Sequence, residues 1–291
     1  MMDTEKISLE VKNLTKKWSD FTLHDINISL PEGYIMGLIG KNGSGKSTLI
    51  NCILDGVKKS RGRVSINGVD HRRVNAKNDI GFILEDGPFF MDKTIAENAY
   101  LFGRFYSDWS ESTFCNYIYQ FELRDYMRYA DLSKGMKTKF QLAFALSHKP
   151  RLLIMDEPTG GMDPVFRRDF LNILQGLVCD SNTAVLFSTH ITADLDKVAD
   201  FITMLDEGKQ VFAMTKEELI DNYPIIRGRR EDLSLIKEGC PMRVRKTSSG
   251  FETILENYNI LSEDSSLWER FTKSRPNLEE IMYFFSEPLI Q

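Results

Sequence analysis

Residues 40–47 read Gly40-Lys41-Asn42-Gly43-Ser44-Gly45-Lys46-Ser47, and this stretch decides the fold class. It matches the pattern G-x-x-x-x-G-K-[ST], in which glycines let backbone N–H groups close around a chain of phosphates. Lys46 can reach the β- and γ-phosphates as a point charge, and the Ser47 hydroxyl suits a Mg²⁺ ion that bridges them. We therefore expect a nucleotide triphosphate to be bound by Asn42, Gly43, Ser44, Gly45, Lys46, Ser47 and Thr48.

The segments on either side of this loop have the composition of a strand and a helix. The apolar run from Tyr34 to Ile39 has the length of a buried strand, and the segment from Ser47 to Leu54 can begin a helix. The N-terminal end of such a helix carries a partial positive charge that would face the phosphates. A glycine-rich turn arising by chance would lack this context, so the sequence favours a phosphate-binding loop.

The second chemical element is a pair of carboxylates after an apolar strand. Residues 152–155 are apolar and are followed by Asp156 and Glu157, and open α/β sheets place ligands at such carboxyl ends. Asp156 is placed to hold the shell of a Mg²⁺ ion, and Glu157 to orient and deprotonate the attacking water. Taken alone, the pair could equally be a surface acidic pair that ends a strand. The upstream loop favours the catalytic interpretation.

Composition excludes several classes of protein. The chain of 291 residues can hold one large domain or two modest ones, and its formal net charge of −5 argues against a broad electrostatic grip on nucleic acid. The four cysteines are scattered without a C-x-x-C pair, which indicates reduced thiols in a cytosolic protein. No apolar signal segment and no uncharged run of the ~20 residues that a membrane helix needs is present. Any membrane part is expected on another chain.

Hydrophobic patterning predicts strands on both sides of a helical block. Residues 7–39 are β-rich, with Ile26, Ile28 and Leu30 alternating, and further strands are expected at 62–68 and 80–84. Short apolar strands return at 151–155, 183–187 and 201–205, whereas the pattern from about 94 to 148 is helical. This order predicts an α/β fold with a parallel sheet covered on both faces.

A third motif, Leu132-Ser133-Lys134-Gly135-Met136, completes an ordered set. With the loop at 40–47, Asp156-Glu157, Gly161-Met162-Asp163-Pro164 and Ser188-Thr189-His190, it resembles the ATP-binding subunit of ABC transporters over residues 8 to about 212. The resemblance implies a P-loop NTPase core with a mostly parallel sheet, an N-terminal antiparallel β subdomain and an inserted helical subdomain at about 86–150. It further implies an ATP-binding domain at 1–212 and a small C-terminal α+β extension at 213–291.

The resemblance also implies roles for single residues. A serine and a glycine N–H at a helix start make an anion site, and in this family the matching Ser133 and Gly135 face the γ-phosphate held by the opposite subunit. Two chains, most simply a homodimer, would thus enclose two ATP molecules with Mg²⁺. Asp163 matches the aspartate that links the two sites, and His190 the histidine that contacts the γ-phosphate. Trp18 matches the aromatic that stacks on adenine, the alternative being a tryptophan packed in the β-rich region.

Partners follow from the same resemblance. We expect separate transmembrane permease subunits, which would hold this chain at the inner face of the cell membrane, and no nucleic-acid partner. The aromatic-rich stretch 88–106 corresponds to the surroundings of a groove for a cytoplasmic helix of the membrane subunit, although most of its aromatics are expected in the core. The motif at 132–136 is most similar to bacterial exporters of antimicrobial or cytolytic peptides and drugs. The cargo itself is read by the membrane subunits.

The main alternative is a soluble ATPase of the same family that acts on ribosomes or on DNA ends. The ribosome-acting kind normally joins two such domains in one chain. The DNA-repair kind inserts a long coiled coil, for which the segment between Ser47 and Leu132 is too short. A P-loop small-molecule kinase gives no reason for the motif at 132–136 or for His190.

The chain departs from the usual family residues near the expected site. The glutamine that usually follows the strand at 80–84 is Glu85, which can still ligate Mg²⁺ but adds negative charge beside the phosphates; alternatively it points to solvent without a role. Lys134 and Met136 replace the usual glycine and glutamine, and residues 160–162 read Gly-Gly-Met instead of Ser-Gly-Leu. The expected metal ligands remain Ser47, Asp156 and Glu85, and the expected catalytic residues Lys46, Glu157 and His190.

The C-terminal part has weaker signals. Thr215-Lys216-Glu217-Glu218 and Asn277-Leu278-Glu279-Glu280 are capping boxes that each predict the start of a helix. Residues from about 224 to 260 are expected to contain strands, with alternation at 242–245 and a turn at 248–250. The last helix has an apolar face, for which we favour docking on the chain's own core over a subunit contact; the face consists of Leu278, Ile281, Met282 and Phe285.

Overall fold

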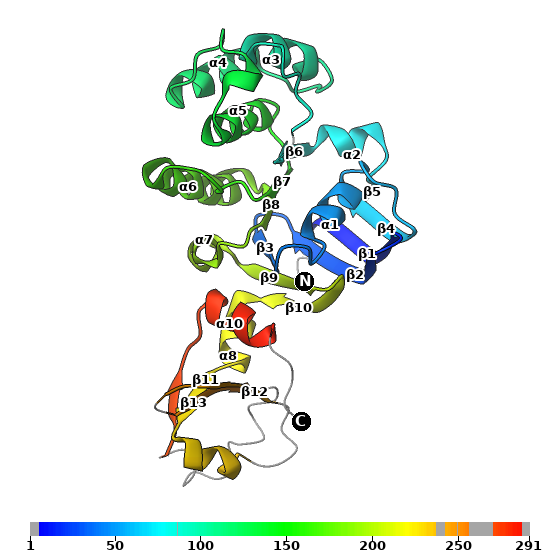
Figure 1. Ribbon diagram of the computed structural model, residues 1–291. Helices are drawn as coiled ribbons and strands as arrows, with labels where there is room; N and C mark the ends of the chain where they lie inside the picture. Colours follow the sequence, from blue (N-terminus) through cyan, green and yellow to red (C-terminus); the bar gives the residue numbers. More distant parts are fainter. Residues whose placement is uncertain (1–5, 86, 237–241, 249, 256–269, 287–291) are drawn as a thin grey trace, which may run out of the picture.

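The computed structural model describes residues 6–85, 87–236, 242–248, 250–255 and 270–286. Their largest element is a ten-stranded sheet in the order β5-β4-β1-β2-β10-β9-β3-β8-β7-β6 (Figure 1). All strands expected in the parallel part are present. This part comprises β3 (Ile35–Ile39), β6 (Ile80–Ile83), β7 (Leu152–Asp156), β8 (Ala184–Ser188) and β9 (Phe201–Asp206).

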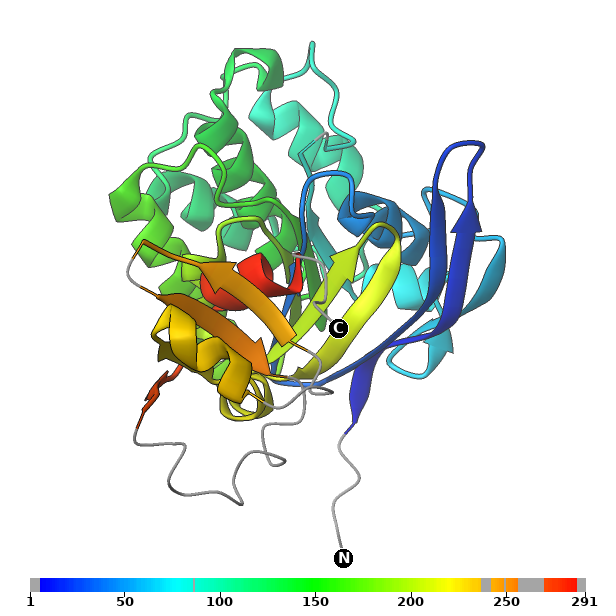
Figure 2. The ribbon, with the colours of Figure 1, turned by 60° about the horizontal axis from the view of Figure 1, so that its bottom comes forward.

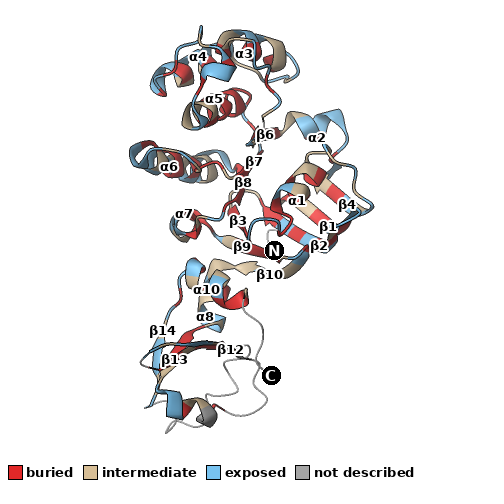
Figure 3. Ribbon diagram, in the orientation of Figure 1, coloured by how far each residue is buried: buried red, intermediate tan, exposed pale blue. Residues whose placement is uncertain are grey.

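These parallel strands are buried because helices cover both faces of the sheet (Figure 3). Successive side chains of a strand point to opposite faces. In β7, Leu153 and Met155 therefore join one core cluster and Leu152 and Ile154 the other. Helix α1 (Lys46–Ile53) packs in the second cluster, and α6 (Pro164–Ser181) and α7 (Thr192–Val198) pack in the first. The α/β class with a covered parallel sheet is confirmed.

The N-terminal strands form the antiparallel half of the same sheet. It comprises β1 (Ile7–Lys17), β2 (Thr22–Pro31), β4 (Arg61–Ile66) and β5 (Val69–Asp70), followed by the short helix α2 (Val74–Asn78). In β2 the alternating residues Ile26, Ile28 and Leu30 are buried, as expected. The two halves are continuous, because β2 pairs in parallel with β10 (Lys209–Thr215), where His24 lies opposite Lys209.

The helical block lies between β6 and β7 in sequence and packs on the end of the sheet. It contains α3 (Ile95–Gly103), α4 (Glu111–Gln120), the 3₁₀ turn η1 (Tyr129–Asp131) and α5 (Lys134–Leu146), which confirms the helical pattern expected from 94 to 148. Its interior is aromatic: the Phe89 ring lies 4.7 Å from that of Phe140 and 5.3 Å from that of Phe144. Within the stretch 88–106, however, the expectation that most aromatics lie in the core is wrong: Phe89 is buried, but Phe90, Tyr100 and Phe105 are exposed.

The C-terminal part has a separate four-stranded sheet in the order β12-β13-β11-β14. Its strands are β11 (Ile225–Gly228), β12 (Met242–Lys246), β13 (Phe251–Leu255) and β14 (Thr272–Ser274), with the 3₁₀ helix η2 (Arg230–Leu235) after β11. The strands expected between 224 and 260 are confirmed where they are described. Ser249, in the expected turn at 248–250, lies outside the described residues. The expected domain boundary after residue 212 falls within β10, and the division of the chain stays a prediction.

Both C-terminal capping boxes are confirmed, at Thr215 for α8 (Lys216–Asn222) and at Asn277 for α10 (Leu278–Phe285). Figure 2 shows α10, in red, behind the orange strands of the small sheet. Three residues of its expected apolar face, Leu278, Ile281 and Phe285, are buried in the main core, which confirms docking on the chain's own core. Phe284 is buried as well, although the expected face omitted it.

The described helices were also compared with the requirements of a membrane span. None of them combines the necessary length with a sufficiently apolar composition.

Candidate nucleotide site

The loop between β3 and α1 is shaped for close approach to an anion. Gly40 and Gly45 have φ angles of 152° and 109°, which disfavour any residue with a Cβ. A Cβ on Gly40 would lie 2.3 Å from the carbonyl oxygen of Leu205 and 2.6 Å from Oγ of Ser44. No side chain caps the start of α1, so its first N–H groups are available to a ligand.

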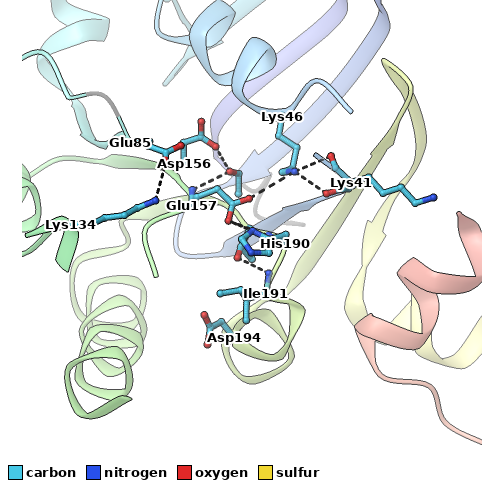
Figure 4. A network of polar contacts seen from close by, with 12 residues as sticks. Lys41, Lys46, Glu85, Lys134, Asp156, Glu157, His190, Ile191 and Asp194 are labelled. Carbon is cyan, nitrogen blue, oxygen red and sulfur yellow. Dashed lines mark hydrogen bonds and ion pairs between the residues drawn. The ribbon is translucent and has the colours of Figure 1, made fainter. Parts of the chain in front are cut away.

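Lys46 is buried beneath this loop and points across its mouth. Its Nζ donates to the carbonyl oxygens of Gly40 at 2.8 Å and Lys41 at 3.3 Å, and lies 3.9 Å from Oε1 of Glu157 (Figure 4). Burial lowers the pKa of Lys46, and the nearby carboxylates of Glu157 and Asp156 oppose that shift. The ammonium is therefore held in place before any phosphate is bound.

Glu157 follows β7 and is fixed by groups on the neighbouring strand. Its φ of 49° is unusual for a residue with a side chain and turns the carboxylate away from the strand direction. Its N–H donates to the Ser188 carbonyl oxygen at 3.0 Å, while its Oε2 accepts from Nδ1 of His190 at 2.7 Å. Ser188 also donates its hydroxyl to Oδ1 of Asp156. The ends of β7 and β8 thus bring Asp156, Glu157 and His190 together.

An open pocket of about 500 Å³ lies over the loop. Its lining includes Trp18, Phe21, Glu85 and Glu157, together with the loop residues Asn42, Gly43, Gly45, Lys46, Ser47 and Thr48. The Trp18 side chain is 51% exposed, with Nζ of Lys16 4.0 Å from its ring centroid, so this tryptophan is not packed in the β-rich core. The pocket offers a cation, backbone donors and an exposed aromatic face.

The donor set of this pocket fits a Mg²⁺-nucleotide. Ser44, although buried, has an Oγ without a hydrogen-bond partner among the described residues. The described residues contain no group of three or more His, Cys, Asp or Glu side chains that could hold a metal ion alone. Mg²⁺ is typically held by one or two carboxylates plus substrate phosphates. Oxygens for that purpose are offered by Ser47, Asp156 and Glu85.

The remaining expected site residues lie outside this pocket. Ser133 caps α5 by accepting from the Met136 N–H at 3.3 Å, and a Cβ on Gly135 would lie 3.3 Å from the Gly161 carbonyl oxygen. Asp163 caps α6 by accepting from two N–H groups of its first turn. These three residues are not brought to the phosphate loop of their own chain.

Several polar residues near the site were missed by the sequence reasoning. Gln141 of α5 donates to the Leu84 carbonyl oxygen and accepts from the Leu84 N–H, which ties the helical block to the end of β6. Arg167 on α6 makes two bonds to the buried carboxylate of Asp194 on α7, at 2.8 and 3.0 Å. Of the residues near the site, Ser188 could have been identified from the sequence, because it begins the motif Ser188-Thr189-His190. No sequence motif points to Gln141, Arg167 or Asp194.

Glu85 does not point to solvent without a partner. Its Oε1 lies 2.6 Å from Nζ of Lys134, the first residue of α5 (Figure 4). This contact leaves open whether Glu85, which is 62% exposed, has a role at the site or points to solvent without one. Its expected role as a metal ligand stays a prediction.

Comparisons with known proteins agree with this geometry. Residues 23–160 match the sequence model of the ABC transporter family. The chain is 30% identical to the bacitracin transport ATP-binding protein BcrA of Enterococcus faecalis over 216 residues, which cover 72% of this chain and 70% of BcrA. It is also 30% identical over 231 residues to the lantibiotic transport ATP-binding protein SrtF of Streptococcus pyogenes, covering 76% of this chain and all of SrtF.

A solved structure shows the same similarity in three dimensions. The chain superposes on an ATP binding subunit of an ABC transporter with a TM-score of 0.66 and 29% identity. The superposition covers 73% of this chain and 92% of that structure. The sequence match at residues 23–160 includes the loop at 40–47.

Proposed function

Because the chain belongs to the family of ABC transporter ATP-binding proteins, we propose that it drives a bacterial exporter of peptides or drugs. The observation that carries the proposal is that Lys46 and Glu157 line one pocket while His190 contacts the carboxylate of Glu157. The roles for which BcrA and SrtF are named, bacitracin and lantibiotic transport, support the export of peptide-like cargo. ATP hydrolysis is the activity of the family.

In the proposed reaction, Lys46 holds the β- and γ-phosphates, while the loop N–H groups surround them. Mg²⁺, held by Ser47, Asp156 and Glu85 with the phosphates, would supply stabilisation of the negative charge that develops. Glu157 accepts a proton from the attacking water. His190 donates Nδ1–H to that carboxylate at 2.7 Å, so Nε2 can donate to the γ-phosphate when the ring carries both protons. Trp18 stacks on the adenine.

We assign Ser133, Gly135 and Asp163 to a second copy's site. Their absence from the phosphate pocket of the same chain is compatible with that assignment. Closing two chains head to tail would place the start of α5 against the opposite nucleotide, where the Ser133 hydroxyl and the helix N–H groups can donate to phosphate. Closure on ATP would then move attached membrane subunits, and hydrolysis would reset them.

An apolar pocket on the helical block suits a helix from such a membrane subunit. It has a volume of about 310 Å³ and lies between α2, β6, α3 and α5, lined by Val74, Lys77, Asn78, Phe82, Phe102, Phe105, Tyr106 and Phe144. Phe105 and Val74 at its rim are 76% and 79% exposed, which is uncommon for large apolar side chains of a lone protein. Docking here would hold the chain at the inner face of the membrane.

A pull-down from native membranes tests this function. We expect the tagged chain to retain a polytopic membrane protein, and Phe105→Asp to lose it while keeping its ATPase activity. Tyr119→Asp is the matched control, because Tyr119 is 87% exposed on α4 and does not line the pocket. Recovery of ribosomal proteins or DNA by the wild type, without a membrane protein, would favour the soluble ATPase instead.

A further inference from the structure

Two departures of this chain from its family meet each other. Glu85 lies just after β6, on the sheet, and Lys134 begins α5, on the helical block, yet Nζ of Lys134 lies 2.6 Å from Oε1 of Glu85. Figure 4 shows the pair beside Asp156 and Glu157. A carboxylate replaces the usual glutamine at one end of this contact, and a cation replaces the usual glycine at the other.

A third departure lies next to the lysine. The Lys134 side chain crosses residues 160–161, so that a Cβ on Gly160 would lie 3.5 Å from its Nζ and a Cβ on Gly161 3.5 Å from its Cδ. A serine at position 160, the usual family residue, would bring a hydroxyl close to the ammonium and compete with Glu85 for it. The three departures at Gly160, Lys134 and Glu85 therefore lie next to one another.

The ion pair of Glu85 and Lys134 lies where the negative charge of Glu85 would repel a phosphate. Glu85 lines the phosphate pocket, and together with Lys134, Asp156 and Glu157 it also lines a second pocket of about 210 Å³ directly beside the first. Two carboxylates, those of Glu85 and Glu157, thus line the expected place of a polyphosphate anion, and that of Asp156 lines the pocket beside it. Lys46 is already engaged with two carbonyl oxygens and Glu157. Lys134 is the cation that contacts Glu85.

The pair contributes little to folding. The Lys134 and Glu85 side chains are 49% and 62% exposed, and exposed ion pairs are weak stabilisers of a fold. Its effect on a neighbouring charge is larger, because an uncompensated carboxylate within a few ångström of phosphate repels it. The consequence of losing Lys134 is therefore expected in nucleotide binding.

We propose that Lys134 is a positioning residue: it holds Glu85 beside the phosphate pocket and offsets its charge until a metal ion takes the ammonium's place. The inference rests on the proposed binding of Mg²⁺-ATP in that pocket. Both the ammonium and the metal ion use the same carboxylate, so they compete. Removing Lys134 should weaken ATP binding in the absence of metal. It should also let Mg²⁺ support ATP binding at a lower concentration, because the ammonium no longer competes for Glu85.

A double-substitution cycle tests this inference. Wild type, Lys134→Met, Glu85→Gln and the double variant are titrated with a fluorescent ATP analogue, first with EDTA and then at rising Mg²⁺ concentration. In the absence of metal, we expect Lys134→Met to weaken binding of the ATP analogue about tenfold when Glu85 is present. In the Glu85→Gln background the effect should be less than about twofold, because no carboxylate is left unpaired. High salt should shrink the tenfold effect.

The matched control is Lys137→Met, which removes a cation from the same helix and the same second pocket but not the partner of Glu85. Equal effects of the two lysine substitutions, additive effects in the cycle, or an unchanged Mg²⁺ requirement in Lys134→Met would each overturn the inference. If the wild type itself fails to bind the analogue, the proposed function fails. The two failures are therefore distinguishable.

Discussion

The two sides of the candidate site are built differently. On the sheet side, Lys46 is buried, and Glu157 forms hydrogen bonds through both its backbone N–H and its carboxylate. The two residues that bond Glu157, namely Ser188 and His190, lie at the carboxyl end of the parallel strand β8. On the helical side, Ser133 and Lys134 are exposed and reach the sheet through the ion pair with Glu85 and the amide of Gln141. The groups that perform chemistry are fixed in advance, whereas the start of α5, which would meet another subunit, is exposed, although the rest of α5 is buried against the sheet.

This difference suggests a division of labour. Pre-organised groups lower the cost of reaching the transition state, so they belong on rigid elements. A segment that must shift on nucleotide binding is drawn from elements with few buried contacts to the rest. Substitutions of the fixed groups on the sheet side should therefore act on turnover within one chain, and those at the exposed start of α5 on steps that involve a second chain or the metal ion.

The largest effect is expected on the sheet side, for Glu157→Gln. Loss of a general base should lower kcat by about 10²–10⁴-fold, whereas ATP binding survives because the phosphate loop is unchanged. Steady-state hydrolysis and equilibrium ATP binding of the purified variant measure the two quantities. Gel filtration with ATP should show that the variant accumulates as a dimer.

Asp163→Asn serves as a comparison, because Asp163 also bears a carboxylate but lies outside the pocket. It should reduce kcat less than Glu157→Gln. Near-normal turnover of Glu157→Gln would refute its assignment as the base and remove the main distinction between the two sides.

The next effect concerns the stability of the helical side in acid. His148 follows α5, is buried, and stacks on Tyr106 with ring centroids 3.9 Å apart. Burial lowers the pKa of His148 to about 4, below its ordinary value of 6.5. As the pH falls from 6.5 to 4, the unfolded chain binds a proton that the folded chain does not, so stability is lost by up to about 3 kcal/mol.

Urea unfolding of wild type and His148→Gln between pH 7 and pH 4 measures this loss. The variant should be less stable than wild type at pH 7 but lose less stability on acidification. His71→Gln is the comparison on the sheet side, because burial also lowers the pKa of His71. It shows how much of the acid-induced loss of stability comes from a buried histidine outside the helical block. An identical pH dependence of wild type and His148→Gln would show that acid acts elsewhere.

The sequence was informative about the sheet side because its determinants are local. Strand, loop and helix follow one another at 34–54, and Asp156 and Glu157 directly follow their strand. The pairing of Glu85 with Lys134 could not be predicted, since the two are 49 positions apart and meet only when α5 packs on β6. The same holds for β14 (Thr272–Ser274), a short strand whose place depends on its pairing with β11.

The third prediction separates two roles of Ser133 on the helical side. As the cap of α5, Ser133 can be replaced by glycine at a cost of only a few tenths of a kcal/mol. As a donor to the phosphate of a second copy, its loss removes a hydrogen bond to a charged group, worth about 1.5–3 kcal/mol or roughly 10–150-fold in hydrolysis. We expect Ser133→Gly to fold normally and to hydrolyse ATP poorly.

Mixing variants shows whether that loss occurs across subunits. A Ser133→Arg chain mixed with a Lys46→Ala chain retains one complete composite site in each heterodimer, so part of the activity should return. Ser110→Gly, which removes the equivalent cap of α4, should leave hydrolysis unchanged. Hydrolysis strictly proportional to chain concentration down to high dilution would exclude a shared site.

The smallest effect is expected at Trp18, which belongs to the sheet side yet is exposed and held by its contact with Lys16. Stacking of a base on an aromatic ring is worth about 1–3 kcal/mol, so Trp18→Ala should weaken ATP binding by roughly 5–150-fold, and Trp18→Phe by much less. Binding of inorganic tripolyphosphate is the sharper measurement, because this anion has phosphates but no base. If Trp18→Ala weakens tripolyphosphate and ATP equally, then Trp18 acts on the shape of the phosphate loop and not on adenine. If only ATP binding is weakened, Trp18 contacts the adenine base. The sheet side then consists of a rigid catalytic part and an exposed aromatic residue that contributes to ATP binding alone.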